Sequence, residues 1–208
     1  MQLVTTRARC WEQRHTHIER TALELFRSRG FDQVTVEDVS AAAGVAPATF
    51  YRHFRTKEDV VFAYTEDFAA ALRQAIAAAA DLVESSRLPV VLDRFAEYLE
   101  SRRDALALRD EIVLGHARLM QRTLTVQRDL ETVLAEGLAD LSGRNPVDAA
   151  ARLQAGLGIL VLRVAVRVWR AEDQASLPVL VGNVLTCLEE MVGSLTHGTA
   201  ATPSPRRP

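Results

Sequence analysis

Apolar residues recur at intervals of three and four positions along nearly all of this chain, and that spacing predicts helices. No stretch alternates apolar and polar residues over several positions, so no strand is predicted. The first helix is predicted over about residues 12–29, where one apolar stripe is formed by Ile18, Ala22, Leu25 and Phe26. The expected fold class is therefore all-α, with about nine helices.

Capping signals set the limits of the next elements. Thr35 stands three residues before Asp38, the spacing of a capping box, and predicts a short helix that stops at Gly44. Pro47 suits the first position of a third helix, Pro47–His53. Thr56 is placed to cap a long fourth helix, which we expect to continue to about residue 84. Later helices are predicted over about residues 89–101, 104–121, 124–141, 146–170 and 176–195.

The segment 35–57, TVEDVSAAAGVAPATFYRHFRTK, has the pattern of a helix-turn-helix, in which two short helices are joined by a tight turn at Gly44. Phe50 and Phe54 are four residues apart and can anchor the second helix in a core. Polar and cationic side chains, including Arg52, occupy another face and suit phosphate oxygens and base edges. The alternative is a helical hairpin inside an unrelated bundle.

Residues 35–59 resemble the DNA-binding signature of the TetR family, with matches at Thr35, Val39, Ser40, Ala43, Gly44, Val45, Thr49, Phe50, Tyr51, His53, Phe54, Thr56, Lys57 and Glu58. The resemblance covers about the first 65 residues and departs at Ala46, where the family often has a serine cap. It implies a homodimer that binds double-stranded DNA at a palindromic operator. The DNA-binding residues that it implies, together with the small residues that open the third helix, are Thr35, Pro47, Ala48, Thr49, Tyr51, Arg52, His53 and Lys57.

The resemblance and the helical pattern together divide the chain into four parts. We expect a flexible arm over residues 1–13, a helix-turn-helix DNA-binding domain over 14–56, a ligand-binding and dimerisation domain over 57–197, and a disordered tail over 198–208. The net charge is −2, but residues 1–57 hold nine basic against six acidic side chains. This basic balance is consistent with a DNA-binding head, although ordinary charge fluctuation would also explain it.

Several features bear on the compartment and the cofactors. Cys10 and Cys187 are far apart, so neither a disulfide nor a metal site is expected, and no cofactor is predicted. No signal peptide is visible. The longest apolar run, 157–169, is interrupted by Arg163 and Arg167 and is shorter than the roughly 20 residues that cross a bilayer. The chain is therefore expected to be soluble and cytoplasmic, with no membrane partner.

The rest of the chain suggests a small-molecule effector of hydrophobic or amphipathic character. The candidate ligand-binding residues are Phe68, Phe95, Tyr98, His116, Met120 and Arg163. Most of the aromatic ones could instead be plain core, and Arg163 could form an ion pair at a surface or dimer interface. Helices 146–170 and 176–195 are the most apolar and are the predicted dimer interface.

These features together predict a DNA-binding transcriptional regulator, a repressor that its effector releases from DNA. The head also resembles a TetR subgroup that senses acyl-CoA-like compounds. The alternative is a DNA-binding regulator that is independent of ligand or controlled by a protein partner. The sequence contains no recognisable catalytic motif, so an enzyme is not expected.

Overall fold

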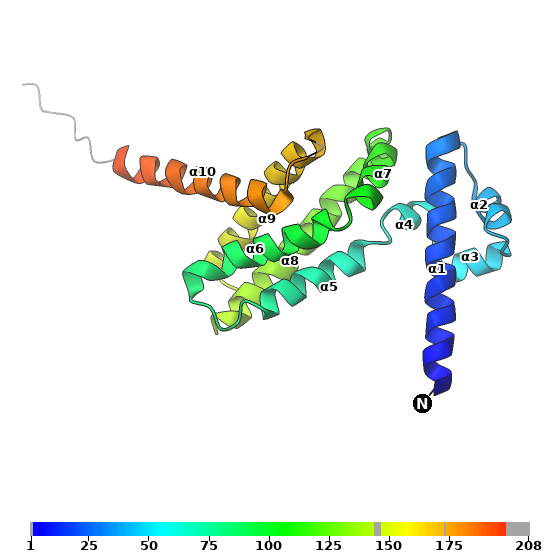
Figure 1. Cartoon of the computed structure of the whole chain (residues 1–208), viewed down its shortest axis with the longest axis horizontal. Coiled ribbons are helices and arrows are strands. Elements are labelled where there is room, and N and C mark those ends of the chain that lie inside the picture. Colours follow the sequence, from blue (N-terminus) through cyan, green and yellow to red (C-terminus); the bar gives the residue numbers. More distant parts are fainter. Residues whose placement is uncertain (1, 144–146, 173, 199–208) are drawn as a thin grey trace, which may run out of the picture. The chain divides into compact units, whose positions relative to one another are not determined.

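The structure is a computed structural model that describes residues 2–143, 147–172 and 174–198 (Figure 1). These residues form ten α-helices and no strand, which confirms the all-α fold class. The helices belong to two compact units, one of Met1–Ala70 with Arg102–Arg128 and the other of Ala71–Ser101 with Asp129–Pro208. Apart from Gly198, which ends a helix, the predicted tail lies outside the described residues.

The first unit is built around α1 (Gln2–Arg29), with α2 (Val36–Ala42) and α3 (Pro47–His53) on one side of it (Figure 1). Helices α4 (Lys57–Val61) and α7 (Arg103–Leu114) also pack on α1. The predicted stripe forms the core, since Ile18 and Ala22 are fully buried and Phe26 nearly so. Val39 and Phe50 join them from α2 and α3.

The second unit contains α6 (Glu84–Glu100), α9 (Ala149–Ala171) and α10 (Leu177–Gly198), and α10 packs on both of the others. Two helices pass from one unit into the other, α5 (Thr65–Ala77) and α8 (Ala117–Leu141). Gly158 of α9 permits close packing, because a Cβ there would lie 3.0 Å from Leu134 Cδ2 and 3.1 Å from Leu88 Cδ1.

The predicted fourth helix over 56–84 is wrong, because the chain turns between Phe62 and Tyr64 and α5 starts afresh at Thr65. Phe62 is buried, and its carbonyl accepts from the Thr65 hydroxyl at 2.7 Å, which holds the turn. The break predicted between residues 84 and 89 lies earlier, at residues 78–83. Pro89 lies inside α6, where burial of neighbouring side chains outweighs the lost backbone hydrogen bond.

Other limits also differ from the prediction. Helix α1 begins at Gln2 rather than near residue 12, since no helix breaker separates the two positions. The chain breaks between α7 and α8 at residues 115–116, not near 122. Asp148 caps α9 by accepting from the Ala151 N–H at 2.8 Å, and the predicted start of this helix at residue 146 lies outside the described residues.

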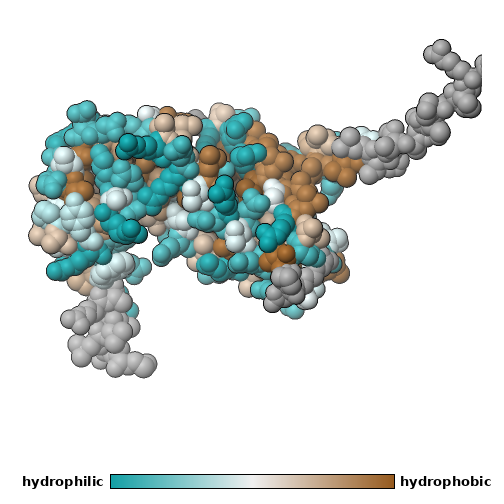
Figure 2. Space-filling model, turned by 180° about the vertical axis from the view of Figure 1, so that it is seen from behind, coloured by the Kyte–Doolittle hydropathy of each residue, from teal (hydrophilic) through white to brown (hydrophobic). Residues whose placement is uncertain are grey.

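Two helices of the second unit, α9 over Ala149–Ala171 and α10 over Leu177–Ser194, are long and apolar enough to cross a membrane by length and composition. The expectation that no segment reaches that length is therefore wrong. Only 33% of the first segment and 11% of the second are buried within the chain. Figure 2 shows apolar side chains gathered over this part of the surface. These faces need a partner or an apolar environment.

Candidate nucleic-acid interface

The turn between α2 and α3 holds the two helices at a fixed angle. Thr35 caps α2 with a complete capping box, since its hydroxyl accepts from the Asp38 N–H at 3.1 Å and its backbone N–H donates to the Asp38 carboxylate at 2.9 Å. Gly44 adopts a φ of +63°, which side-chain-bearing residues rarely adopt. The Val45 N–H then donates to the Ser40 carbonyl at 2.9 Å.

Helix α3 is anchored on one face and free on the other. Phe50 and Phe54 are buried, with ring centroids 5.6 Å apart. Ala46 provides no side-chain cap, as its replacement of serine implies, and Pro47 occupies the start of the helix. The anchoring face is therefore the one that the spacing of the phenylalanines predicted.

The free face of α3 carries predicted DNA-binding residues. Pro47, Ala48 and Arg52 are exposed, Thr49 is half-buried, and Tyr51 keeps 52% of its surface exposed. The Tyr51 ring packs edge-on against Phe50, which limits its motion. Arg52 makes no hydrogen bond or ion pair with the part of the chain that the structure describes. A phenol and a free guanidinium on one exposed helix suit contact with phosphates and bases.

Two of the predicted phosphate-binding residues also serve the fold. The Lys57 ammonium donates to the Phe31 carbonyl at 2.7 Å and to the Val34 carbonyl at 3.0 Å, and it lies 4.4 Å from the centroid of the Phe31 ring. The Thr35 hydroxyl belongs to the helix cap, and its hydrogen bonds lower the pKa of Asp38. Sequence reasoning predicted the cap at Thr35 but missed the structural role of Lys57.

His53 lies in an aromatic cluster rather than on the open face of α3. Its ring is 4.8 Å from that of Trp11 and 5.6 Å from that of His15, and His15 lies 4.3 Å from Phe54. Burial lowers the pKa of His53, and the charges of His15, Arg14 and Arg52 lower it further. Burial also lowers the pKa of His15. Sequence reasoning missed Trp11, although it extends the α1 stripe four residues before His15.

Contacts within the first unit join α7 and α8 to the helices of the head. The buried Arg109 of α7 pairs with Glu19 of α1 and donates to the Ala105 carbonyl at 2.9 Å. Burial raises the pKa of Glu19, although Arg109 opposes the shift. At the start of α8, His116 Nδ1 lies 3.5 Å from Asp32 Oδ2.

A third contact joins Arg122 of α8 to Asp59 of α4, with the guanidinium 2.5 Å from the carboxylate. Burial raises the pKa of Asp59, but the hydrogen bond and charge of Arg122 outweigh it and the pKa is lowered. Arg122 also lies over the Phe62 ring, 5.0 Å from its centroid. Sequence reasoning missed both carboxylate–arginine pairs, whose members are far apart along the chain.

The predicted ligand-binding residues fall into both compact units. Phe68, His116 and Met120 belong to the first unit, and Phe95, Tyr98 and Arg163 belong to the second. Phe68 and Phe95 are buried, whereas Met120 and Arg163 are exposed. His116 faces Asp32 and the Phe31 ring, which is a contact with the head. Their role in binding a ligand stays a prediction.

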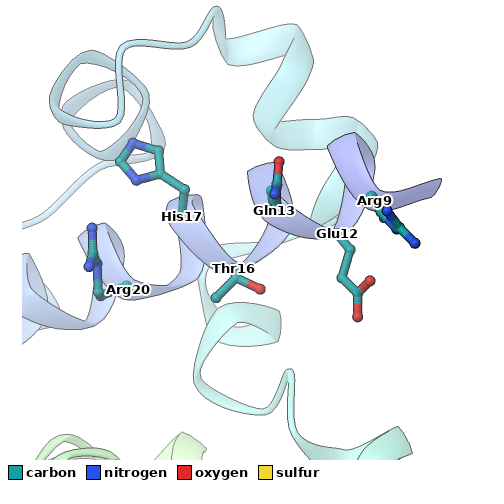
Figure 3. A pocket seen from close by; sticks show the side chains of 6 residues that line it. All are labelled: Arg9, Glu12, Gln13, Thr16, His17 and Arg20. Carbon is teal, nitrogen blue, oxygen red and sulfur yellow. The ribbon is translucent and has the colours of Figure 1, made fainter. Parts of the chain in front are cut away.

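A shallow depression on the surface of α1 is lined by residues of that helix (Figure 3): Arg9, Glu12, Gln13, Thr16, His17 and Arg20. His17 points to α2, where its Nε2 lies 3.2 Å from the Ala43 carbonyl oxygen. Because a single helix lines it, the depression is open and offers little enclosure to a small molecule.

The capped α2, the turn at Gly44 and the exposed side of α3 define a helix-turn-helix protein of the DNA-binding class. Residues 18–64 match the family model of the bacterial regulatory proteins of the tetR family. The match covers the DNA-binding head, which is therefore of the TetR type.

Curated relatives are transcriptional regulators. The chain is 27% identical over 171 residues to the proposed mycofactocin biosynthesis transcriptional regulator MftR of Mycobacterium tuberculosis, covering 80% of this chain and 84% of MftR. It is 47% identical over 57 residues to the HTH-type transcriptional regulator TcmR of Streptomyces glaucescens, covering 26% of this chain and 25% of TcmR. The shorter match has the higher identity.

Solved structures share the fold. One is the TetR-family repressor FadR of Thermus thermophilus in complex with lauroyl-CoA, with a TM-score of 0.57 and 22% identity, covering 93% of this chain and 99% of FadR. Another is a TetR-family regulator of Syntrophomonas wolfei, with a TM-score of 0.65 and 18% identity, covering 86% and 95% of the two chains. At these identities the likeness shows the helical architecture alone.

Proposed function

We propose that this chain is a homodimeric repressor that binds a palindromic operator through α2 and α3 and is released by an amphipathic small molecule. The observation that carries the proposal is the division of α3 into a face anchored by Phe50 and Phe54 and an exposed face with Tyr51 and Arg52. The family's regulators act in the cytoplasm on DNA, and we propose the same compartment and no catalytic activity for this chain.

A second copy of the chain is the partner that we propose for the apolar faces of α9 and α10. Large apolar side chains on these helices are exposed: Leu153, Leu160, Val164, Val179, Met191 and Val192. Exposed arginines of α9, among them Arg152, Arg163 and Arg167, argue against a lipid environment, where charges are costly. A two-fold dimer would cover the same patch on both copies, and its symmetry fits a palindromic operator.

The class of effector that we propose is an acyl-CoA or a molecule of similar amphipathic character. The Thermus thermophilus FadR structure contains lauroyl-CoA, and that of Bacillus subtilis FadR, which is 21% identical with a TM-score of 0.54, contains stearoyl-CoA. The resemblance of the head to acyl-CoA-sensing regulators supports the same class. The ligand-binding residues predicted from the sequence are the first positions at which to test this proposal by substitution.

The ligand can act only by favouring one arrangement of the chain over another. A coupling of about 1–3 kcal/mol would weaken DNA binding roughly 5- to 150-fold. Arg109 and Arg122 are placed to transmit such a change, because both lie in the segment Arg102–Arg128 and pair with Glu19 of α1 and Asp59 of α4. That segment continues into α8, which gives the proposed signal a covalent path.

The test is a DNA-binding assay with a duplex selected from a random pool by the wild-type chain. We expect Tyr51→Ala to weaken binding to every duplex, and we expect lauroyl-CoA, but not free CoA, to release the selected one. If the wild-type chain enriches no sequence, the proposal that it is a DNA-binding regulator is contradicted. Selected binding that lauroyl-CoA leaves unchanged would contradict release by acyl-CoA and favour a ligand-independent or partner-controlled regulator.

A further inference from the structure

The middle of α1 lies against the end of the recognition helix α3. Trp11 stacks on His15 at 5.0 Å between ring centroids and lies 4.8 Å from His53, the last residue of α3. These contacts fix one face of α1 against His53, the residue that follows Arg52. These ring contacts therefore join the middle of α1 to the end of α3.

Trp11, His15 and His53 form a junction between α1 and α3. The charged groups that act on its His53 side are all positive. Arg14 lies three residues after Trp11, about 4.5 Å further along the helix axis. Arg14, Arg52 and His15 all act on the His53 ring as positive charges, after the larger effect of burial, and lower its pKa. The acidic residues Glu66 and Asp67 act on His15 and not on His53. The His53 side of the junction is thus locally cationic, on a chain whose net charge is −2.

The arginines of the junction are available to a partner. Arg14 and Arg52 are exposed and make no hydrogen bond or ion pair with the residues that the structure describes. Trp11 keeps 53% of its surface exposed although it stacks on the His15 ring and lies against the His53 ring. Two unpaired guanidinium groups beside a flat apolar ring suit the sugar–phosphate backbone of a nucleic acid.

We propose that Arg14 of α1 and Arg52 of α3 together bind a phosphate of the DNA strand that flanks the recognition helix, with Trp11 as the residue that positions α1 for this contact. The operator is the occupant because the junction adjoins the exposed face of α3 and has the opposite charge to a phosphate. This inference rests on the proposed function and extends its DNA-binding surface beyond the helix-turn-helix.

The experiment measures the affinity of the full chain for the selected duplex by fluorescence anisotropy over a range of salt concentrations. Each lost phosphate contact reduces the slope of log affinity against log salt by about 0.9, hence by about two for a dimer. We expect Arg14→Gln to show this reduction and to weaken binding by about three- to tenfold per half-site. Arg14→Lys keeps the charge, and we expect it to keep most of the slope.

Arg27→Gln is the matched control, because Arg27 is an exposed arginine of the same helix thirteen residues further on, about 20 Å along its axis. We expect the wild-type slope from this variant. Phosphate ethylation interference gives a second readout, since wild-type binding is expected to depend on one phosphate per half-site, and Arg14→Gln is expected to be less sensitive to ethylation of that phosphate.

The possible results separate the two proposals. In one outcome, the wild type selects and binds a duplex while Arg14→Gln and Arg27→Gln show the same slope of log affinity against log salt. That result refutes the phosphate contact of Arg14 and leaves the proposed regulator function intact. If the wild type selects no duplex at all, both proposals are refuted. A variant that loses affinity at unchanged slope and with a lowered melting temperature would assign Arg14 a structural role, which also refutes the contact.

Discussion

The ammonium group of Lys57 binds two backbone carbonyls in the chain between α1 and α2. This arrangement gives a residue of the DNA-binding signature a role in holding the head together. Hydrogen bonds from charged groups to partly buried acceptors stabilise proteins more than neutral ones do. Loss of DNA binding on substitution of Lys57 would therefore combine a lost phosphate contact with a loosened head.

Replacing Lys57 by methionine keeps most of the side-chain volume and removes both donors. We expect the free energy of unfolding to fall by about 1.5–3 kcal/mol, because the Phe31 and Val34 carbonyls lose their charged partner. Urea denaturation followed by circular dichroism measures the change. Unchanged stability in this variant would show that the two hydrogen bonds contribute nothing to the fold.

The pH dependence of stability provides a test of the histidine cluster. Burial lowers the pKa values of His15 and His53 from their ordinary 6.5, so the folded head favours neutral rings. The unfolded chain takes up protons first as the pH falls, so the stability that is present above about pH 6.5 declines below it. We expect the melting temperature to fall between pH 7 and pH 5.5.

The matched comparison for that measurement is His15→Phe, which keeps an aromatic ring without a titrating nitrogen and should show a shallower decline. The raised pKa of Glu19 acts in the opposite direction, since its stabilising effect is lost as the pH rises through the folded value. Glu19 is present in both proteins, so its contribution to the pH dependence of stability cancels when the two are compared. Equal slopes in the two proteins would rule out a contribution from His15.

At the scale of the elements, Gly158 decides how closely α9 can approach its neighbours. A Cβ at this position would lie 3.0–3.4 Å from side-chain carbons of Leu134, Leu88 and Leu92. These carbons come from α8 and α6 within the second unit, where Leu134 and Leu92 are fully buried. The glycine therefore sets the spacing of three helices at once.

Gly158→Ala should lower the free energy of unfolding by about 1–3 kcal/mol, because the added methyl group must displace packed leucines. Gly156→Ala on the same helix is the control, since its Cβ would meet only Glu131 Oε1, at 3.6 Å. For Gly156→Ala we expect the free energy of unfolding to rise by about 0.5–1 kcal/mol, because alanine forms helices better than glycine does. Thermal denaturation compares the two, and a stabilised Gly158→Ala would contradict the close packing.

Local signals allowed some elements to be predicted and long-range contacts determined the others. The start of α2 followed from the capping box of Thr35 and Asp38, and that of α3 followed from Pro47. The turn after Phe62 could not be predicted, because it contains no glycine or proline and depends on burial. In the site, the exposed face of α3 was predictable, whereas the partners of Lys57 were not, since they lie 23 and 26 residues away.

For the whole molecule, the exposed apolar faces of α9 and α10 are the feature that most needs explanation. Val179 and Met191 of α10 are 60% and 64% exposed. Side chains of this kind are rarely left open to water over a large continuous patch. The proposed homodimer accounts for them and supplies the second head that a palindromic operator requires.

We expect Val179→Glu combined with Met191→Glu to convert a dimer into a monomer, because two carboxylates would be buried without partners. Size-exclusion chromatography with light scattering measures the mass against the 23.0 kDa of one chain. Glu66→Gln changes an exposed residue of α5 and serves as the control, for which we expect the mass of the wild type. A wild type that already runs as a monomer would exclude the dimer, and detergent-dependent solubility would favour a membrane instead.

The position of Trp11 gives the protein an optical probe of its own DNA-binding surface. The chain has two tryptophans, and the other, Trp169, is buried in the second unit. Indole emission depends on solvent access and on neighbouring rings, so the exposed Trp11 and the enclosed Trp169 should emit at different wavelengths. With Trp169→Phe, emission from Trp11 would report occupation of the head by DNA without any attached dye.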